Sequence, residues 1–288
     1  MKGIVLAGGT GSRLWPITLA VSKQLLPIYN KPLIYYPISV LMQAGIREIL
    51  IITTPGDQKA FQSLLGDGSS FGLLFTYAIQ ENPKGIAQAF IIGKEFIGND
   101  EVALILGDNL FYGVSIEKEL TSKLIDKGAR IFTYNVANPT EYGVLNLDSN
   151  FEPISVEEKP KNPKSNLAIT GLYFFDAKVT EFANEIKPSK RGELEITEIM
   201  QLYINNKDLE FVKLPTGVAW LDTGSPNSLS DASQFVRVLE ERTGKNIACL
   251  EEIAYSKGWI SISDLSNRVS FYGDCSYGKY LNKILNSL

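Results

Sequence analysis

Histidine is absent from all 288 residues of the sequence. Without an imidazole, the protein cannot use a Ser-His-Asp triad, a Cys-His pair or a zinc ion held by histidine. Any chemistry must therefore rely on carboxylates, lysine, arginine, backbone amides or a hard cation held by oxygen ligands.

Three further features narrow the classes of protein to which this chain can belong. It has few cysteines, no long apolar run and no excess of positive charge. The two cysteines, Cys249 and Cys275, form neither a metal-binding spacing nor a disulfide framework, which favours a reducing cytoplasm. The apolar stretch at 4–7 is too short for a signal peptide or a membrane span, and no later stretch reaches membrane length. The formal net charge is −4 and the basic residues form no run. We therefore expect a cytoplasmic globular protein with no nucleic-acid partner and no membrane partner.

Short apolar runs alternate with helical patterns through the first half of the chain. The pattern predicts strands at 3–7, 48–53, 73–78, 102–106 and 129–135, and helices at 37–44, 57–65, 85–96 and 116–127. Strands that are apolar throughout and alternate with helices are typical of a parallel sheet with both faces covered. We expect an α/β fold with a Rossmann-like, mostly parallel mixed sheet flanked by helices.

The pattern changes in the second half. Strand-like segments separated by turn residues predict a small antiparallel insertion near the C-terminal edge of the sheet, at 143–147, 153–157 and 167–175. Helices at 177–185 and 195–204 and strands at 210–214 and 219–221 follow. From Ser225 the pattern is helical, with a turn near Gly273. We therefore expect an α/β core at 1–224 and a helical C-terminal part at 225–288.

A glycine-rich loop, Gly8-Gly9-Thr10-Gly11, directly follows the first predicted strand and precedes Arg13. Glycines let backbone amides approach a ligand closely, and a run of amides at a strand end can bind an anion. Arg13 adds a cation whose planar geometry suits phosphate oxygens. A tight turn that simply needs glycine is the alternative, but Arg13, Pro16 and Lys23 favour a phosphate loop. The spacing matches neither GxGxxG nor GxxxxGK[ST], which disfavours a Rossmann dehydrogenase.

Two aspartates follow predicted strands. Asp108 comes after the strand at 102–106, and Asp222 ends the short segment Trp220-Leu221-Asp222. Ligands bind at the carboxyl ends of strands in open α/β sheets, and two such aspartates suit a Mg²⁺ ion that also takes phosphate oxygens and water. For each aspartate alone, a role in a turn or a helix cap is the alternative. Lys159 also ends a predicted strand, where an ordinary surface lysine is the alternative.

The segment LAGGTGSRLWPIT at 6–18 resembles the signature of the sugar nucleotidyltransferases. The continuation at 22–37, SKQLLPIYNKPLIYYP, is similar to the glucose-1-phosphate thymidylyltransferases within that family. Further similar stretches lie at 85–90, 106–113, 142–144, 156–160, 168–175, 192–197, 219–224 and 248–254. The resemblance therefore spans nearly the whole chain.

The resemblance implies a Mg²⁺-dependent transfer of a thymidylyl group from dTTP to glucose 1-phosphate, feeding deoxysugar and surface polysaccharide biosynthesis. It implies a nucleotide half at about 1–110 and a sugar-phosphate half at about 111–224. It also implies a homo-oligomer, often a tetramer, for which the part from Ser225 could form an interface. A structural cap on the sheet is the other reading of that part.

Site residues are carried over position by position. The resemblance places Arg13, Lys23, Asp108, Lys159 and Asp222 in catalysis, with Mg²⁺ on Asp108 and Asp222. It implies nucleotide contacts by Leu6, Gly8, Gly9, Thr10, Gly11, Arg13, Lys23, Gln24, Gln80, Pro83, Gly85 and Asp108, of which Gln24, Gln80 and Gly85 would read the base. It implies sugar-phosphate contacts by Asn109, Tyr142, Gly143, Glu158, Lys159, Ile169, Thr170 and Trp220. Trp220 could equally belong to the core.

Two departures concern a second site. Relatives that are inhibited by a deoxysugar nucleotide between subunits often carry arginine and His-Asp where this sequence has Thr216 and Val114-Ser115. That effector site is therefore in doubt here.

Two alternative functions stay open. One is a uridylyltransferase, and the other is a non-catalytic nucleotide-sugar sensor, which would be expected to lose Arg13, Lys159 or an aspartate.

Overall fold

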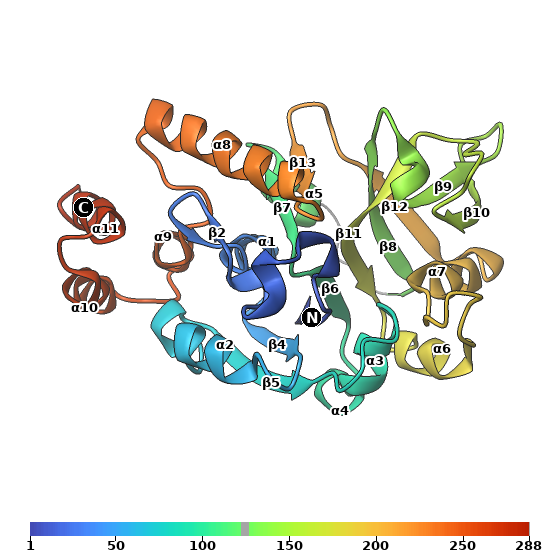
Figure 1. The fold of residues 1–288 in the computed structure, drawn as a ribbon, viewed down its shortest axis with the longest axis horizontal. Coiled ribbons are helices and arrows are strands. Elements are labelled where there is room, and N and C mark those ends of the chain that lie inside the picture. Colours follow the sequence, from blue (N-terminus) through green and yellow to red (C-terminus); the bar gives the residue numbers. More distant parts are fainter. Residues whose placement is uncertain (122–126, 288) are drawn as a thin grey trace.

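A nine-stranded sheet forms the centre of the computed structural model, which describes residues 1–121 and 127–287 (Figure 1). Four neighbouring strands run parallel, in the order β6-β1-β4-β5. Their bounds are Lys2–Ala7 for β1, Glu48–Thr53 for β4, Leu74–Ile79 for β5 and Val102–Leu106 for β6. The predicted parallel α/β arrangement of the first half is confirmed.

The antiparallel strands continue the same sheet. β11 (Leu167–Phe175) pairs antiparallel with β6, so that Leu172 lies opposite Ile105. β11 also pairs with β9 (Gly143–Leu147) and β8 (Ala129–Asn135), which in turn pair with β10 (Pro153–Glu158) and β12 (Leu209–Lys213). The predicted strands at 143–147, 153–157 and 167–175 are thus present. They extend the main sheet because β11 is apolar and buried along most of its length.

Two sets of helices cover the two faces of the sheet. One face holds α1 (Tyr35–Gln43), α2 (Gln58–Leu65), α5 (Ile116–Thr121) and α9 (Leu250–Ser256). The other holds α3 (Gln88–Ile92), α4 (Lys94–Ile97), α6 (Val179–Glu185) and α7 (Ile196–Asn205). Alternate residues of β1 point to opposite faces, with Val5 in the first apolar cluster and Ile4 in the second. The predicted helix at 116–127 extends into 122–126, which lie outside the described residues.

The predicted helix at 85–96 is shorter and interrupted. Residues 85–87 form a loop in which the Ala87 N–H donates to the carbonyl of Leu194, and Gly93 separates α3 from α4. The predicted cap at Asp57 also differs. Its carboxylate accepts from the Thr54 hydroxyl instead of a helix N–H.

Two small two-stranded sheets lie beside the main one. β7 (Asn109–Tyr112) pairs antiparallel with β13 (Ala219–Asp222), and β2 (Pro27–Ile28) pairs with β3 (Lys31–Pro32). β7 was not predicted, because only two residues separate it from β6 and its partner is more than one hundred residues away. Short 3-10 helices occur at Ser12–Leu14, Ile17–Leu19, Lys23–Leu25, Ser69–Phe71 and Pro139–Glu141.

The C-terminal part is helical, as predicted. It comprises α8 (Pro226–Thr243), α9, α10 (Ile262–Tyr272) and α11 (Ser276–Leu285), and the last two pack on each other beyond α9 at the left of Figure 1. Ser225 starts α8 with a capping box. A buried ion pair of 2.7 Å between Lys31 and Glu240 ties α8 to the β2–β3 hairpin. The division at 224 stays a prediction.

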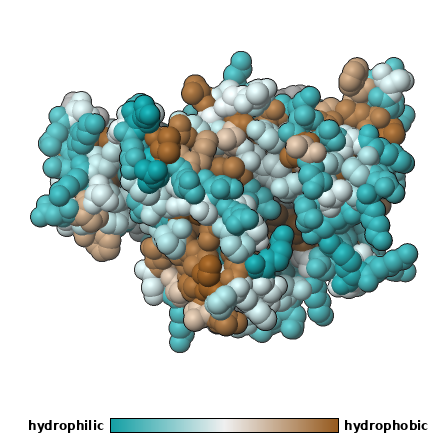
Figure 2. All heavy atoms as spheres, turned by 45° about the horizontal axis from the view of Figure 1, so that its top comes forward, coloured by the Kyte–Doolittle hydropathy of each residue, from teal (hydrophilic) through white to brown (hydrophobic). Residues whose placement is uncertain are grey.

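The surface is mostly polar on the face shown in Figure 2, where hydrophobic side chains are gathered in separate patches. Within 1–121 and 127–287, no helix has both the length and the apolar character needed to cross a membrane.

Candidate active site

The glycine loop turns sharply at the end of β1. Gly9 and Gly11 have φ values of +107° and +58°, a region that favours glycine. Gly8 matters for a different reason, because a Cβ there would lie 2.2 Å from Oε1 of Gln80 and would force that side chain to move. The loop lines a cavity, which we call the loop cavity. Gly8, Gly9, Thr10 and Gly11 of the loop form part of its wall. The other lining residues are Ser12, Arg13, Leu14, Lys23, Gln24, Pro83, Asp108, Glu193 and Gly224.

Lys23 and Asp108, which both line this cavity, form an ion pair. The Lys23 ammonium lies 2.7 Å from Oδ2 of Asp108, and its side chain is only 8% exposed. Asp108 occupies the connection between β6 and β7, and its Oδ1 accepts from the Asn109 amide. The ion pair is neutral overall, but it fixes the Lys23 ammonium in the lining of the cavity, where the ammonium can contact an anion.

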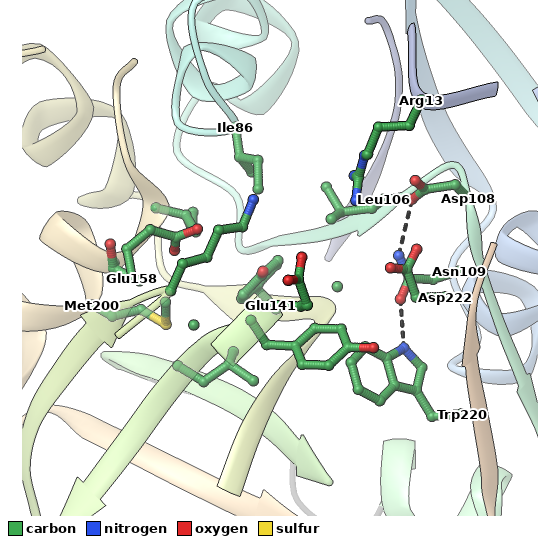
Figure 3. Close-up of a pocket in the computed structure, with 18 residues that line it drawn as sticks. Arg13, Ile86, Leu106, Asp108, Asn109, Glu141, Glu158, Met200, Trp220 and Asp222 are labelled. Atoms are coloured by element: carbon green, nitrogen blue, oxygen red, sulfur yellow. Dashed lines mark hydrogen bonds between the residues drawn. The ribbon is translucent and has the colours of Figure 1, made fainter. Parts of the chain in front are cut away.

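The pairing of β7 with β13 brings Asp222 next to Asp108. Asp222 lies opposite Asn109, and the Thr223 hydroxyl donates to the backbone carbonyl of Asp108 at 2.8 Å. Burial, and then the charge of Asp108, raise the pKa of Asp222, while Lys23 and Arg13 oppose the rise. Figure 3 shows Arg13 extending toward the two aspartates. The site thus concentrates two carboxylates and two cations.

A second cavity, which we call the sheet cavity, lies over the antiparallel strands (Figure 3). The Trp220 indole donates to Asn109 Oδ1 on one side of it, and the rings of Trp220 and Tyr142 lie 5.1 Å apart. Trp220 therefore belongs to the core and to the cavity wall at once. The other lining residues are Arg13, Ile86, Leu106, Asp108, Glu141, Gly143, Glu158, Lys159, Ile169, Gly171, Tyr173, Ile196, Thr197, Met200 and Asp222.

Lys159 adopts an unusual backbone conformation at the end of β10. Its φ is +45°, and its N–H donates to the carbonyl of Tyr142 at 3.0 Å. A residue with a Cβ is disfavoured in this region, and such residues concentrate at functional sites. Lys159 therefore lines the sheet cavity in a strained backbone conformation.

Arg191 is a candidate site residue that the sequence alone did not reveal. Its guanidinium lies 3.6 Å from Oε1 of Glu158 and donates to Glu193 and Glu195. Burial and the charge of Glu195 raise the pKa of Glu158, which Arg191 and Lys159 lower. The signal that could have found Arg191 is its place directly before the matching stretch at 192–197.

Most predicted site residues line one of the two cavities, but four do not. Thr170 faces the opposite side of β11 from Ile169, and its hydroxyl donates to the carbonyl of Phe132, because successive strand residues alternate in direction. Leu6 packs in the second apolar cluster. Gly85 packs against the backbone of Leu194, and Gln80 lies behind Gly8.

The two cavities share Arg13 and Asp108. They are therefore adjacent compartments of one site. Two anionic ligands, one in each compartment, would meet at these two residues.

Comparison with known sequences decides the family. A sequence profile described as nucleotidyl transferase matches residues 2–238. The chain belongs to this family. A relative from Neisseria meningitidis, named glucose-1-phosphate thymidylyltransferase, is 52% identical over 286 residues and covers 99% of each chain. A relative from Mycolicibacterium smegmatis with the same name is also 52% identical, again over 99% of each chain.

Solved structures of the family show the same fold. One from Bacillus anthracis, described as a glucose-1-phosphate thymidylyltransferase in complex with sucrose, is 42% identical and has a TM-score of 0.76. It aligns with 82% of this chain and 95% of its own. A UDP-glucose pyrophosphorylase complexed with UDP-glucose is 25% identical, with a TM-score of 0.74 over 83% of this chain and 98% of its own.

Proposed function

We propose that the protein transfers a thymidylyl group from dTTP to glucose 1-phosphate, giving dTDP-glucose and pyrophosphate. The names of the full-length relatives support this choice of substrates. The observation that carries it is the meeting of the loop cavity and the sheet cavity at Arg13 and Asp108. A phosphate bound in each cavity would be held at this junction.

The triphosphate occupies the loop cavity in this proposal. Backbone amides of the glycine loop face its oxygens, and Arg13 and Lys23 add positive charge. Lys23 is already buried and paired with Asp108. A cation fixed in this way needs little reorganisation when the anion binds.

The sugar phosphate occupies the sheet cavity. Lys159 supplies positive charge for its phosphate, and Glu158, which Arg191 approaches to 3.6 Å, accepts a hydrogen bond from a sugar hydroxyl. The apolar faces of Tyr142 and Trp220 provide a surface for the sugar ring. Thr170 acts only from behind the wall, since its hydroxyl is already bonded to the backbone.

Asp108 and Asp222 would hold a Mg²⁺ ion. Two carboxylates in a largely buried site, with the pKa of Asp222 raised in part by Asp108, are a donor pair that a divalent cation would stabilise. In the described part of the chain, no group of three or more carboxylate or sulfur ligands surrounds a metal position. This fits Mg²⁺, which usually takes one or two carboxylates and completes its shell with water and substrate phosphates. When bound, the ion neutralises charge on the phosphate oxygens.

The reaction is an in-line displacement at the α-phosphorus. A phosphate oxygen of the sugar phosphate forms the new P–O bond, while the bond to the β-phosphate oxygen breaks and pyrophosphate leaves with the electron pair. The attacking oxygen is already an anion near neutral pH, so no general base is needed, in agreement with the absence of histidine. The protein holds two anions together and neutralises their charge with Arg13, Lys23 and Lys159.

Pyrophosphate release in the presence of Mg²⁺ and glucose 1-phosphate tests the proposal. Parallel reactions receive dTTP, UTP, CTP, ATP or GTP, and we expect dTTP to be used best. The second candidate is uridylyl transfer, which the fold of the UDP-glucose pyrophosphorylase favours. dTTP and UTP differ by the C5 methyl group of the base and by the 2′-hydroxyl of the sugar, and the methyl group alone discriminates by only about 10- to 200-fold in a pocket. Preference for UTP would replace the first proposal with the second. If none of the five nucleotides supported pyrophosphate release, both proposals would be contradicted.

A further inference from the structure

A chain of amide hydrogen bonds lies behind the glycine loop. Gln80 directly follows β5, and its side chain is almost fully buried, with 2% exposed. Its Nε2 donates to Oε1 of Gln88, the first residue of α3, at 2.8 Å. The same oxygen of Gln88 also accepts the backbone N–H of Lys84 at 2.9 Å.

The Lys84 N–H fixes the direction of the whole chain. A backbone N–H can only donate, so the atom of Gln88 that faces it must be the carbonyl oxygen. That oxygen can only accept, so Gln80 must turn its amino group toward Gln88. The opposite orientation of the Gln80 amide would place two oxygens against each other.

Oε1 of Gln80 therefore points toward Gly8. It would lie 2.2 Å from a Cβ at that position, which places it directly behind a wall of the loop cavity. Within the described residues, no group donates a hydrogen bond to this oxygen. The oxygen nevertheless keeps some exposure to solvent. Although Gln80 does not line the loop cavity, its Oε1 is an acceptor of fixed orientation that is not sealed from solvent.

Gln24 presents the complementary group. The Ser22 hydroxyl donates to its Oε1 at 2.7 Å, which leaves Nε2 without a partner in the part of the chain that is described. Gln24 lines the loop cavity. One glutamine thus offers an acceptor and the other a donor. Thymine and uracil carry an N3–H between two carbonyl oxygens, and this edge matches the pair when N3 faces Oε1 of Gln80. In the same register, N3 of cytosine would place an acceptor against that oxygen.

We propose that Gln88 is a positioning residue that sets the base selectivity of the nucleotide site. By fixing the amide of Gln80, it presents an acceptor to the N3–H of thymine or uracil and disfavours cytosine. Gln88 acts through Gln80 and does not touch the base. The inference rests on the proposed function, since it assumes that the base lies beside Gly8.

The test compares dTTP with dCTP in the parent protein and in two variants, Gln88→Met and Gln88→Glu. Methionine removes the acceptor but keeps the length of the side chain, so Gln80 is free to turn. We expect the ratio of kcat/KM for dTTP over dCTP to fall at least about tenfold in Q88M. A carboxylate can only accept, so Q88E should keep the parent ratio within about threefold.

Binding titrations of both nucleotides separate this inference from the proposed function, because they need no turnover. A parent protein that binds dTTP no better than dCTP contradicts both. A parent preference that Q88M retains, or that Q88E loses, overturns the role of Gln88 alone. The parent protein also allows a test without substitution. N3-methyl-dTTP lacks the N3–H and should bind at least about tenfold more weakly than dTTP, and equal binding would refute the acceptor role of Gln80.

Discussion

Replacing Glu158 with glutamine should make the protein more stable and less active. The Glu158 side chain is 24% exposed in the sheet cavity, and burial, followed by the charge of Glu195, raises its pKa. Arg191 does not compensate fully. Its guanidinium lies 3.6 Å from Glu158, while its hydrogen bonds go to Glu193 and Glu195. Ionised Glu158 is therefore held in an unfavourable place.

The sign of the stability change follows from the raised pKa. The unfolded pKa of glutamate is about 4.3. When the pKa of an acid is higher in the folded protein than in the unfolded chain, ionisation of that acid lowers the free energy of unfolding as pH rises, and the full loss is reached above the folded pKa. Glutamine removes that cost, and the lost attraction to Arg191 is worth only about 0.2–1 kcal/mol. About 1 kcal/mol corresponds to roughly 2–4 °C in a chain of this size. We expect Tm of Glu158→Gln to rise by roughly 1–3 °C at pH 8 and the difference to shrink toward pH 4.

The activity should change in the opposite direction. A hydrogen bond from a sugar hydroxyl to a charged acceptor is worth about 1.5–3 kcal/mol, so kcat/KM for glucose 1-phosphate should fall about ten- to hundredfold. The KM for dTTP should stay within about twofold, since Glu158 does not line the loop cavity. Pyrophosphate release at varied concentrations of each substrate measures both values.

Glu157→Gln is the matched control. Glu157 is the preceding residue of β10, does not line the sheet cavity, and accepts from the Asn146 amide at 2.9 Å, which glutamine can also do. We expect its use of glucose 1-phosphate to match that of the parent protein. A lower Tm for Glu158→Gln at pH 8 would refute the stability argument, and an unchanged kcat/KM for glucose 1-phosphate would refute the sugar contact.

Four further perturbations probe the site. Asp108→Asn or Asp222→Asn should lose most pyrophosphate release while circular dichroism stays native, and release at the parent rate in both would remove them from the metal site. Chelation by EDTA should stop release and added Mg²⁺ should restore it, whereas release that survives chelation would exclude a required metal. Lys159→Ala should chiefly reduce the use of glucose 1-phosphate, and unchanged kcat and KM would count against its role. Gly8→Ala should raise the KM for dTTP, because the new Cβ displaces the Gln80 side chain, so an unaltered KM would contradict the placement of the base.

Local patterns in the sequence were sufficient for much of the fold. The apolar strands of the first half and their parallel arrangement follow from periodicity, since β1, β4 and β6 are buried on both faces. The boundaries of the helix at 85–96 could not be predicted, because the backbone of 85–87 bonds to Leu194, which is distant in sequence. The glycine loop was recognisable because its glycines and Arg13 lie within six residues of each other.

The sequence by itself determined the kinds of groups that this protein can use: carboxylates, lysines, an arginine and loop amides, with no imidazole. Only the tertiary structure decided which of them meet. The pairing of β7 with β13 places Asp222 beside Asp108, and the fold brings Arg191 to Glu158. It also fixes which end of the Gln80 amide faces Gly8, through a hydrogen bond from Lys84 to Gln88. These arrangements depend on contacts between segments distant in sequence or on the orientation of a single amide, and neither leaves a periodic signal in the chain.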